Sequence, residues 1–388
     1  MRRIAIIGPA YPLRGGLATF NQRLAKQFID EGDDCELISF SLQYPGFLFP
    51  GTTQFSDEAP PGWIVIHTKI NSINPLNWWQ VGEWLKSQRY DVIIVRYWLP
   101  FMGPALGTIL RLAKKGGYSK IICIADNVIP HEQRPGDKQF TRYFLKTCDA
   151  FITMSEKVLS DLRLFEPRKP ARFVQHPLYD NFGDKIDKQA ARKKLGLPPS
   201  QKLILFFGFI RAYKGLDLLL EAMATARIKE EAITLLVAGE FYEDARRYLE
   251  LIEQLGIQSR VELKTVFIPD SEVKFYLCAA DAVIQPYRSA TQSGVTPLAY
   301  HFEKPMVVTN VGGLPALVPH LKCGVVCEPQ PEAIAAAVLQ FYELGEAHFI
   351  PHLQIEKLKY TWTNITRAVW ELSEQLPAHD HPATPRAE

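Results

Sequence analysis

The stretch LFFGFIRAYKGLDLLLEA, residues 205–222, decides the expected fold of the second half of this chain. The apolar run 203–207 predicts a buried parallel strand, and leucines at helical spacing predict a helix after it. Gly208 permits a tight turn, so Arg211 and Lys214 fall at the carboxyl end of the strand, where open α/β sheets bind their ligands. The stretch therefore predicts an anion site, and a solvated basic turn is the alternative.

Strand-like and helix-like segments alternate through the whole chain, which predicts an α/β protein with parallel sheets covered on both faces. The 388 residues exceed one ordinary core and fit two doubly wound domains. The expected strands are 4–7, 36–40, 63–67, 92–95, 121–125 and 150–154 in the first half, and 203–207, 234–238, 261–264, 282–285 and 306–310 in the second.

The domain boundaries follow from shifts in composition along the chain. Residues 1–177 are expected to form the first domain and 201–355 the second, because strand and helix patterns fill both ranges. The polar, proline-containing stretch 178–200 between them is expected to be a linker. A last helical pattern falls within 356–375, and the tail 376–388 is expected to be disordered because it has little to bury.

The composition is that of a folded protein without a strong charge bias. Hydrophobic residues make up 47% and charged residues 22%, and the formal net charge is +2, which gives no reason to expect nucleic acid as a partner. No apolar run reaches the roughly 18 residues of a membrane-spanning helix, so the expected location is the cytoplasm. The six cysteines lie far apart and mostly in apolar segments, which predicts buried, reduced thiols.

Five features of the sequence occur in a distinctive order. The glycine-rich loop GPAYPLRGGLATF at 8–20 opens the first half, and the Arg211–Lys214 turn, VFIP at 266–269, CAADAVIQPY at 278–287 and the glycines 312–313 follow in the second. This set resembles the GT-B glycosyltransferases, specifically the large retaining family four, over most of the chain. The resemblance implies two Rossmann-like, doubly wound domains facing a cleft, with the C-terminal helix crossing back onto the first domain.

The same resemblance implies transfer of a sugar from a nucleoside-diphosphate sugar to a glycan, lipid-linked or small-molecule acceptor, with retention of configuration. The leaving diphosphate gains negative charge as the glycosidic bond breaks, and a metal or fixed donors must stabilise it. No Asp-x-Asp triplet occurs in the sequence, which disfavours a metal-held diphosphate, and neither a metal nor another cofactor is expected. The resemblance assigns Arg211 and Lys214 to the diphosphate as catalytic groups.

The segment SATQSGVT, residues 289–296, is expected to follow a strand and open a helix, so its amides suit phosphate or sugar hydroxyls. Ordinary N-capping by its hydroxyls is the alternative. Gly15 and Gly16 are expected to let backbone amides reach the donor phosphates, and plain turn glycines are the alternative there. The full set of expected donor-binding residues is Gly15, Gly16, Gly208, Val266, Ile268, Gln292, Ser293, Gly294, Val295 and Thr296.

The chain departs from the family pattern at two positions. The family carries two glutamates in this region, separated by seven residues, and their places are taken here by Ala290 and Leu298. Either Gln292, Ser293 and Thr296 replace those carboxylates in a divergent branch, or catalysis has been lost. Two alternatives to a transferase therefore stay open: a catalytically silent nucleotide-sugar-binding protein, and a nucleotide-sugar epimerase of the same fold.

Polar residues after two strands of the first half form the expected acceptor side. Asp126, Asn127 and His131 follow the fifth expected strand, and Arg96 and Trp98 follow the fourth. Asp126 is expected to orient or deprotonate an acceptor hydroxyl, and His131 to hydrogen-bond the transferred sugar, as catalytic groups. The alternatives are a turn cap for Asp126 and core packing for Trp98.

Aromatic residues gather in two expected loops of the first half, 44–55 and 73–79, with Phe47, Phe49 and Trp78 among them. Exposed, these side chains would contact lipid or a large acceptor, and buried they would close the core. Burial is the favoured interpretation. Peripheral contact with the inner face of a membrane stays a hypothesis.

Overall fold

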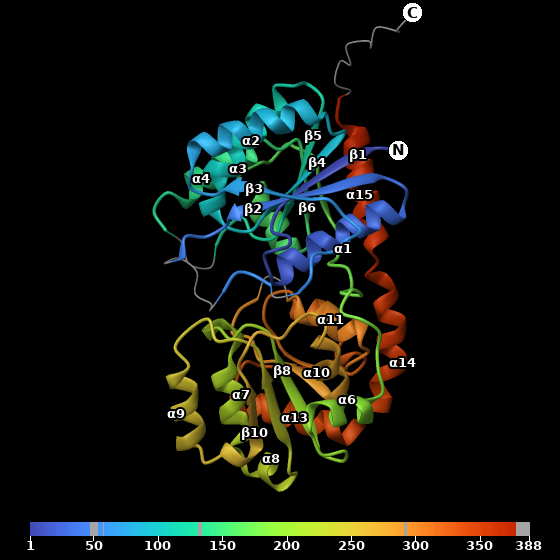
Figure 1. Cartoon of the computed structure of the whole chain (residues 1–388). Helices are drawn as coiled ribbons and strands as arrows, with labels where there is room; N and C mark the ends of the chain where they lie inside the picture. Colours follow the sequence, from blue (N-terminus) through green and yellow to red (C-terminus); the bar gives the residue numbers. More distant parts are fainter. Residues whose placement is uncertain (47–52, 57, 131–133, 291–292, 378–388) are drawn as a thin grey trace, which may run out of the picture. The chain divides into compact units, whose positions relative to one another are not determined.

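The computed structural model describes residues 1–46, 53–56, 58–130, 134–290 and 293–377, and it divides the chain into two compact units (Figure 1). The described residues up to His176, together with those from Thr361 onward, form the first unit. Pro177–Tyr360 forms the second. The tail 378–388, most of the segment expected to be disordered, lies outside the described residues.

The first unit contains a seven-stranded parallel sheet in the order β3-β2-β1-β4-β5-β6-β7. The inner strands are mostly apolar because helices cover both faces, and all six residues of β4 are buried. The strands are β1 (Arg3–Ile7), β2 (Asp34–Leu42), β3 (Ile66–Asn71), β4 (Val92–Tyr97), β5 (Lys120–Ala125), β6 (Ala150–Thr153) and β7 (Ala171–Phe173).

Two groups of helices cover this sheet. Figure 1 shows α2, α3 and α4 on one face and α1 with α15 on the other, and α15 packs against α1, β5 and β6 although it comes last in the chain. Alternate residues of a strand point to opposite faces, so Ile93 and Val95 of β4 join Leu106 and Phe144 in the core under α3 and α4. The helices are α1 (Gly16–Asp30), α2 (Pro75–Gln88), η2 (Pro100–Met102), α3 (Gly103–Lys114), α4 (Asp137–Leu145), α5 (Glu156–Arg163) and α15 (Trp362–Gln375).

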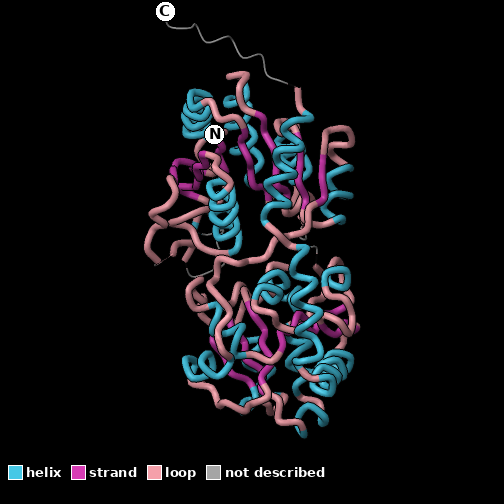
Figure 2. The backbone as a smooth tube through the Cα atoms, turned by 90° about the vertical axis from the view of Figure 1, so that its right-hand side faces the viewer, coloured by secondary structure: helices cyan, strands magenta, loops and turns pink. Residues whose placement is uncertain are grey.

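The second unit contains a six-stranded parallel sheet in the order β10-β9-β8-β11-β12-β13, and Figure 2 shows the strands of each unit lying between helices. Its strands are β8 (Leu203–Phe207), β9 (Thr234–Ala238), β10 (Val261–Lys264), β11 (Ala282–Gln285), β12 (Met306–Thr309) and β13 (Gly324–Cys327). Its helices are α6 (Lys188–Leu195), η3 (Ala212–Lys214), α7 (Leu216–Met223), α8 (Ala226–Glu230), α9 (Arg246–Gln254), η4 (Gln258–Arg260), α10 (Val273–Ala279), α11 (Val295–His301), α12 (Leu314–Leu317), α13 (Pro331–Leu344), α14 (Glu346–Glu356) and η5 (Lys357–Lys359).

Both sheets have the strand order of a doubly wound nucleotide-binding fold, which confirms the predicted fold class. The sequence prediction differs from the structure at the sheet edges. The strand expected at 63–67 begins three residues later, at Ile66, and Trp63 and Val65 are exposed. The edge strands β7 and β13 do not appear among the eleven expected strands, because only a short stretch of each carries an apolar pattern.

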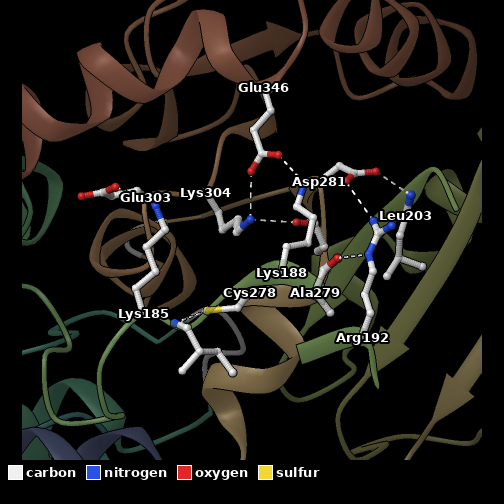
Figure 3. A network of polar contacts seen from close by, with 12 residues as sticks. Lys185, Lys188, Arg192, Leu203, Cys278, Ala279, Asp281, Glu303, Lys304 and Glu346 are labelled. Carbon is white, nitrogen blue, oxygen red and sulfur yellow. Dashed lines mark hydrogen bonds and ion pairs between the residues drawn. The ribbon is translucent and has the colours of Figure 1, made fainter. Parts of the chain in front are cut away.

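The stretch 178–200, which the sequence predicts as a linker, lies within the second unit and carries α6. Asp187 caps this helix, and Arg192 inside it donates to the carbonyl oxygen of Ala279 at 2.9 Å and to Asp281 at 3.0 Å (Figure 3). The same Asp281 carboxylate accepts the backbone N–H of Leu203 at the start of β8. The polar character of the stretch therefore reflects a helix paired with a half-buried acid.

Candidate functional site

The second unit has a topological switch point between β8 and β11. The chain leaves these neighbouring strands toward opposite faces of the sheet, and ligands of such sheets bind at the carboxyl ends of the two strands. Gly208 follows β8 with a φ of +92°, and the Cβ of any residue replacing Gly239 would lie 2.2 Å from the carbonyl oxygen of Gly208. The backbone is therefore drawn close together at this edge, and glycine is needed at both positions.

Lys214 reaches back to this edge from the short helix η3. Its Nζ lies 3.2 Å from the place where a Cβ at Gly208 would be, and 5.9 Å from the centroid of the Tyr287 ring. Gly215 ends the turn at a φ of +68°, and a Cβ there would lie 2.0 Å from the carbonyl oxygen of Pro286. The turn after β8 thus packs directly on the turn after β11, with the ammonium beside both.

The cations of this turn have no carboxylate partner within the described part of the chain. Lys214 is 8% exposed, and burial, together with the charge of Arg211, lowers the pKa of its ammonium to about 7. Arg211 is exposed, with its guanidinium 5.1 Å from the centroid of the Tyr242 ring. The buried acid of the α7 first turn, Asp217, binds Arg247 and Arg288 instead. Arg211 and Lys214 are thus both available to an anion.

The segment after β11 is held by hydrogen bonds to Gln285, the last residue of that strand, and by one bond within the segment. Ser293 and Thr296 both donate to Oε1 of Gln285, at 2.6 Å and 3.0 Å, and the N–H of Val295 donates to Ser293 Oγ at 3.2 Å. All four residues are buried. Both hydroxyl protons therefore point toward Gln285 inside the protein. To a bound sugar nucleotide, these residues can offer only their backbone groups and the lone pairs of their hydroxyl oxygens. Gln292 lies outside the described residues.

Other expected donor contacts differ in exposure. Val295 comes within 3.8 Å of the Gly208 Cβ position, and Gly294 lies against the ring of Tyr179. Val266 is exposed, whereas Ile268 is buried and belongs to the core. The structure therefore gathers Gly208, Lys214 and Val295.

The two positions that lack the family glutamates are closely packed. Leu298 lies in α11 and is 3% exposed, so an apolar, buried side chain takes the place of the second family glutamate. Ala290 is 9% exposed, and a Cβ at Gly312, where φ is +53°, would lie 1.6 Å from its carbonyl oxygen. The backbone after β11 and the backbone after β12 thus touch, and only a glycine allows this approach.

An aromatic cluster that the sequence reasoning missed lies at the same edge. The Phe209 ring stacks on Tyr242 at 4.1 Å between centroids and on Phe267 at 6.3 Å. These residues follow the adjacent strands β8, β9 and β10. The sequence could have indicated this cluster, because one aromatic residue follows closely after each of these three strands. Stacked rings of this kind suit the flat face of a nucleobase.

The first unit has an equivalent switch point between β1 and β4, and Arg96 of β4 lies there. Its Nε and Nη2 donate to the two carboxylate oxygens of Asp126 at 2.7 Å and 2.6 Å, and its guanidinium lies 3.8 Å from the centroid of the Phe20 ring. Burial raises the pKa of Asp126, and Arg96 offsets part of that rise. Arg96 Nη1 is buried without a partner among the described residues.

The remaining acceptor-side predictions have mixed outcomes. Trp98 donates from Nε1 to the Tyr44 hydroxyl at 2.6 Å and packs edge-on against Phe40, as the core-packing alternative expects. Asn127 is half-buried beside Asp126. His131 lies outside the described residues. The structure therefore brings Arg96 and Asp126 together as a pair, and the half-buried Trp98 packs on the core.

Gly15 and Gly16 open α1 at the end of the first glycine-rich loop. Gly15 is its N-cap with a φ of +102°, and Gly16 is its first helical residue. Trp78 and Trp79, which the sequence places in a loop at 73–79, lie in α2 instead. Trp78 is half-buried and donates to the carbonyl oxygen of Asn71, Trp79 is 58% exposed, and Phe47 and Phe49 lie outside the described residues. No described helix has both the length and the apolar character needed to cross a membrane.

Two family comparisons match the two halves of the chain. Residues 187–349 match the family described as glycosyl transferases group 1, and residues 14–177 match the one described as glycosyltransferase family 4. Among curated proteins, a D-inositol 3-phosphate glycosyltransferase of Corynebacterium urealyticum is 32% identical over 50% of this chain and 49% of its own length. The chain thus spans about half of that relative. An uncharacterized glycosyltransferase of Methanocaldococcus jannaschii is 26% identical over 94% of this chain and 96% of its own.

Solved structures share the fold at low identity. Sucrose-phosphate synthase from Thermosynechococcus elongatus superimposes with a TM-score of 0.75 and 18% identity, over 97% of this chain and 99% of that one. The HepE protein of Anabaena, solved in complex with UDP and glucose, superimposes with a TM-score of 0.74 and 16% identity, over 97% and 100%. These likenesses concern the two-unit fold as a whole.

Proposed function

The chain belongs to the group 1 glycosyltransferases of the GT-B fold, and from this premise we propose that it transfers a sugar from a nucleoside-diphosphate sugar to a glycan, lipid-linked or small-molecule acceptor. One observation carries the proposal. Lys214 is buried beside Gly208 at the switch point of the second sheet, and no carboxylate of the described residues neutralises it. The complexes of the Anabaena protein with UDP and with UDP-glucose support a donor of this class.

In the proposed reaction, Lys214 and Arg211 hold the diphosphate and stabilise the charge that develops on it as the sugar departs. A cation that is already desolvated gains more from a developing negative charge than one in water. We propose that the acceptor hydroxyl attacks from the face that the diphosphate leaves, assisted by the departing phosphate, which gives retention. The amides of Gly15, Gly16 and of the segment after β11 would contribute further phosphate contacts.

On the acceptor side, we propose that Arg96 and Asp126 work as a pair. The bidentate contact fixes the carboxylate in one orientation, while Arg96 keeps Nη1 as a donor without a partner in the described chain. Asn127 and His131 follow in the same segment and complete the proposed acceptor side. The exposed Trp79 keeps the hypothesis of peripheral membrane contact open to test by vesicle binding.

A thermal-shift panel tests the donor class. We expect the melting temperature to rise with one nucleoside diphosphate among UDP, ADP, GDP and CDP, because a ligand at 100 times its dissociation constant adds about 2.7 kcal/mol to the stability of the folded state. The matching nucleosides, which lack phosphate, are the control and should give a smaller shift. A flat response to every diphosphate would overturn the proposal. Product formation from the sugar nucleotide without any acceptor would favour the epimerase alternative.

The affinity for that nucleoside diphosphate should fall as the pH rises above about 7. The pKa of Lys214 in the free protein is about 7, and a bound diphosphate raises it, so binding takes up a proton between these two values. The charged form binds, so the dissociation constant should increase by up to about tenfold per pH unit in that window. Calorimetry in two buffers of different ionisation enthalpy measures the proton uptake. Lys214→Met should abolish both the uptake and the slope, and a slope that persists in Lys214→Met would assign it to another group.

A further inference from the structure

Gln285 is a buried amide that has no role in the proposed reaction. It is the last residue of β11 and is 1% exposed, so its side chain lies inside the protein at the carboxyl end of the strand that borders the switch point. Its Oε1 accepts the hydroxyls of Ser293 and Thr296. One carbonyl oxygen therefore fixes two points of the turn 293–296, which we call the donor turn.

We propose that Gln285 is a positioning residue that sets the donor turn against the phosphate site, and this inference rests on the proposed function. The family glutamates are absent at Ala290 and Leu298, so no carboxylate of those two positions orders this part of the chain. In this chain, a neutral amide beneath the turn orders it instead. Gln285 acts through Ser293 and Thr296, and it does not itself touch the donor.

The contacts that begin at Gln285 reach the phosphate site in two steps. Ser293 Oγ accepts the N–H of Val295, and Val295 Cγ2 lies 3.8 Å from the Gly208 Cβ position. Ser293 Oγ also lies 3.3 Å from the hydroxyl oxygen of Tyr287, whose ring faces Lys214. A shift of the donor turn would therefore move Val295 and Tyr287, the two side chains that lie next to Gly208 and Lys214.

The amide is not placed there for stability. Gln285 Nε2 is buried without a partner among the described residues, and an unsatisfied buried donor is unfavourable. Leucine would fill the same volume without that penalty, although Ser293 and Thr296 would then lose their acceptor. These opposing effects should nearly cancel in the folded state, whereas the donor turn would lose the two hydrogen bonds that tie it to β11.

The test compares nucleotide affinity with stability. In Gln285→Leu we expect the dissociation constant for the nucleoside diphosphate selected by the thermal-shift panel to rise about tenfold, the scale of one lost hydrogen-bonded constraint. We expect the melting temperature without ligand to change little. Gln201→Leu is the matched control, since Gln201 donates to Thr234 at 2.8 Å at the opposite, amino-terminal edge of the same sheet. It should leave affinity unchanged.

Double mutants distinguish a positioning role of Gln285 from a general loss of order in the second unit. Ser293→Ala and Thr296→Val should each weaken binding severalfold in the wild-type background, and neither should weaken it further when added to Gln285→Leu. These two variants also decide the matter if Gln285→Leu fails to fold, because unchanged affinity in both would overturn the inference. Equal affinity in Gln285→Leu and wild type would overturn it as well. Failure of wild type to bind any diphosphate in the panel would instead reject the proposed function.

Discussion

Replacing Lys214 by alanine is expected to lower kcat/KM by about two orders of magnitude, because it removes about 2–4 kcal/mol of stabilisation from the departing diphosphate. The reason is the place of the ammonium. It is buried at the switch point beside Gly208 and has no carboxylate partner in the described residues, so its charge is directed to a ligand and not to the fold. The measurement is the rate of sugar transfer or of donor hydrolysis with the nucleotide sugar that the panel selects.

Two further variants isolate the charge. Lys214→Met keeps the apolar stem and should lose as much activity, with a free energy of unfolding no lower than that of wild type, because a buried ammonium without a carboxylate partner is costly. Lys202→Ala is the matched control, since Lys202 is an exposed lysine just before the same strand and pairs with Glu231 at 2.5 Å. It should keep full activity. Retention of activity in Lys214→Met would show that the diphosphate does not depend on this charge.

The fold followed from the sequence where the pattern was local. The expected bounds of β8, β9, β10 and β11 agree with the structure. The signal is clearest in β8 and β9, because inner strands covered on both faces are almost entirely apolar and each of these two ends just before a glycine. The edge strand β3 lacks that signal. Of the six residues of β3, Ile70 alone is buried. The sequence of this strand therefore shows neither the alternation of apolar and polar residues nor the residue at which the strand begins. The family, inferred from the order of short motifs, is confirmed by the matches to both halves.

The candidate site was predictable where chemistry and chain position coincide, as for Lys214, which follows its own strand by seven residues. Pairings between distant residues were not. Arg96 and Asp126 were each expected on the acceptor side, but nothing in the sequence says that they bind one another across 30 residues. Ser293 and Thr296 look like free hydroxyls until Gln285 is seen beneath them. A polar residue shows its type in sequence, and only the fold shows whether its hydrogen bond is already used.

The largest stability effect is expected at the Arg96–Asp126 pair. Asp126→Ala leaves a guanidinium that is 2% exposed without its carboxylate, and breaking a buried ion pair in this way costs about 3–5 kcal/mol. All seven tryptophans of the chain lie in the first unit, so tryptophan fluorescence during urea unfolding reports on the unit that holds the pair. The expected result is a lower midpoint for that fluorescence transition.

Two further variants show whether the loss of stability comes from the buried, unpaired charge. Asp30→Ala removes the carboxylate of an exposed pair with Lys26 in the same unit, and it should cost no more than about 1 kcal/mol. Replacing both partners of the buried pair, Arg96→Met with Asp126→Leu, should cost less than Asp126→Ala alone, because no buried charge is left unpaired. If Asp126→Ala instead unfolds like wild type but no longer transfers sugar, the carboxylate acts on the acceptor directly. A loss of stability that Arg96→Met reverses would show that its first task is to hold the arginine.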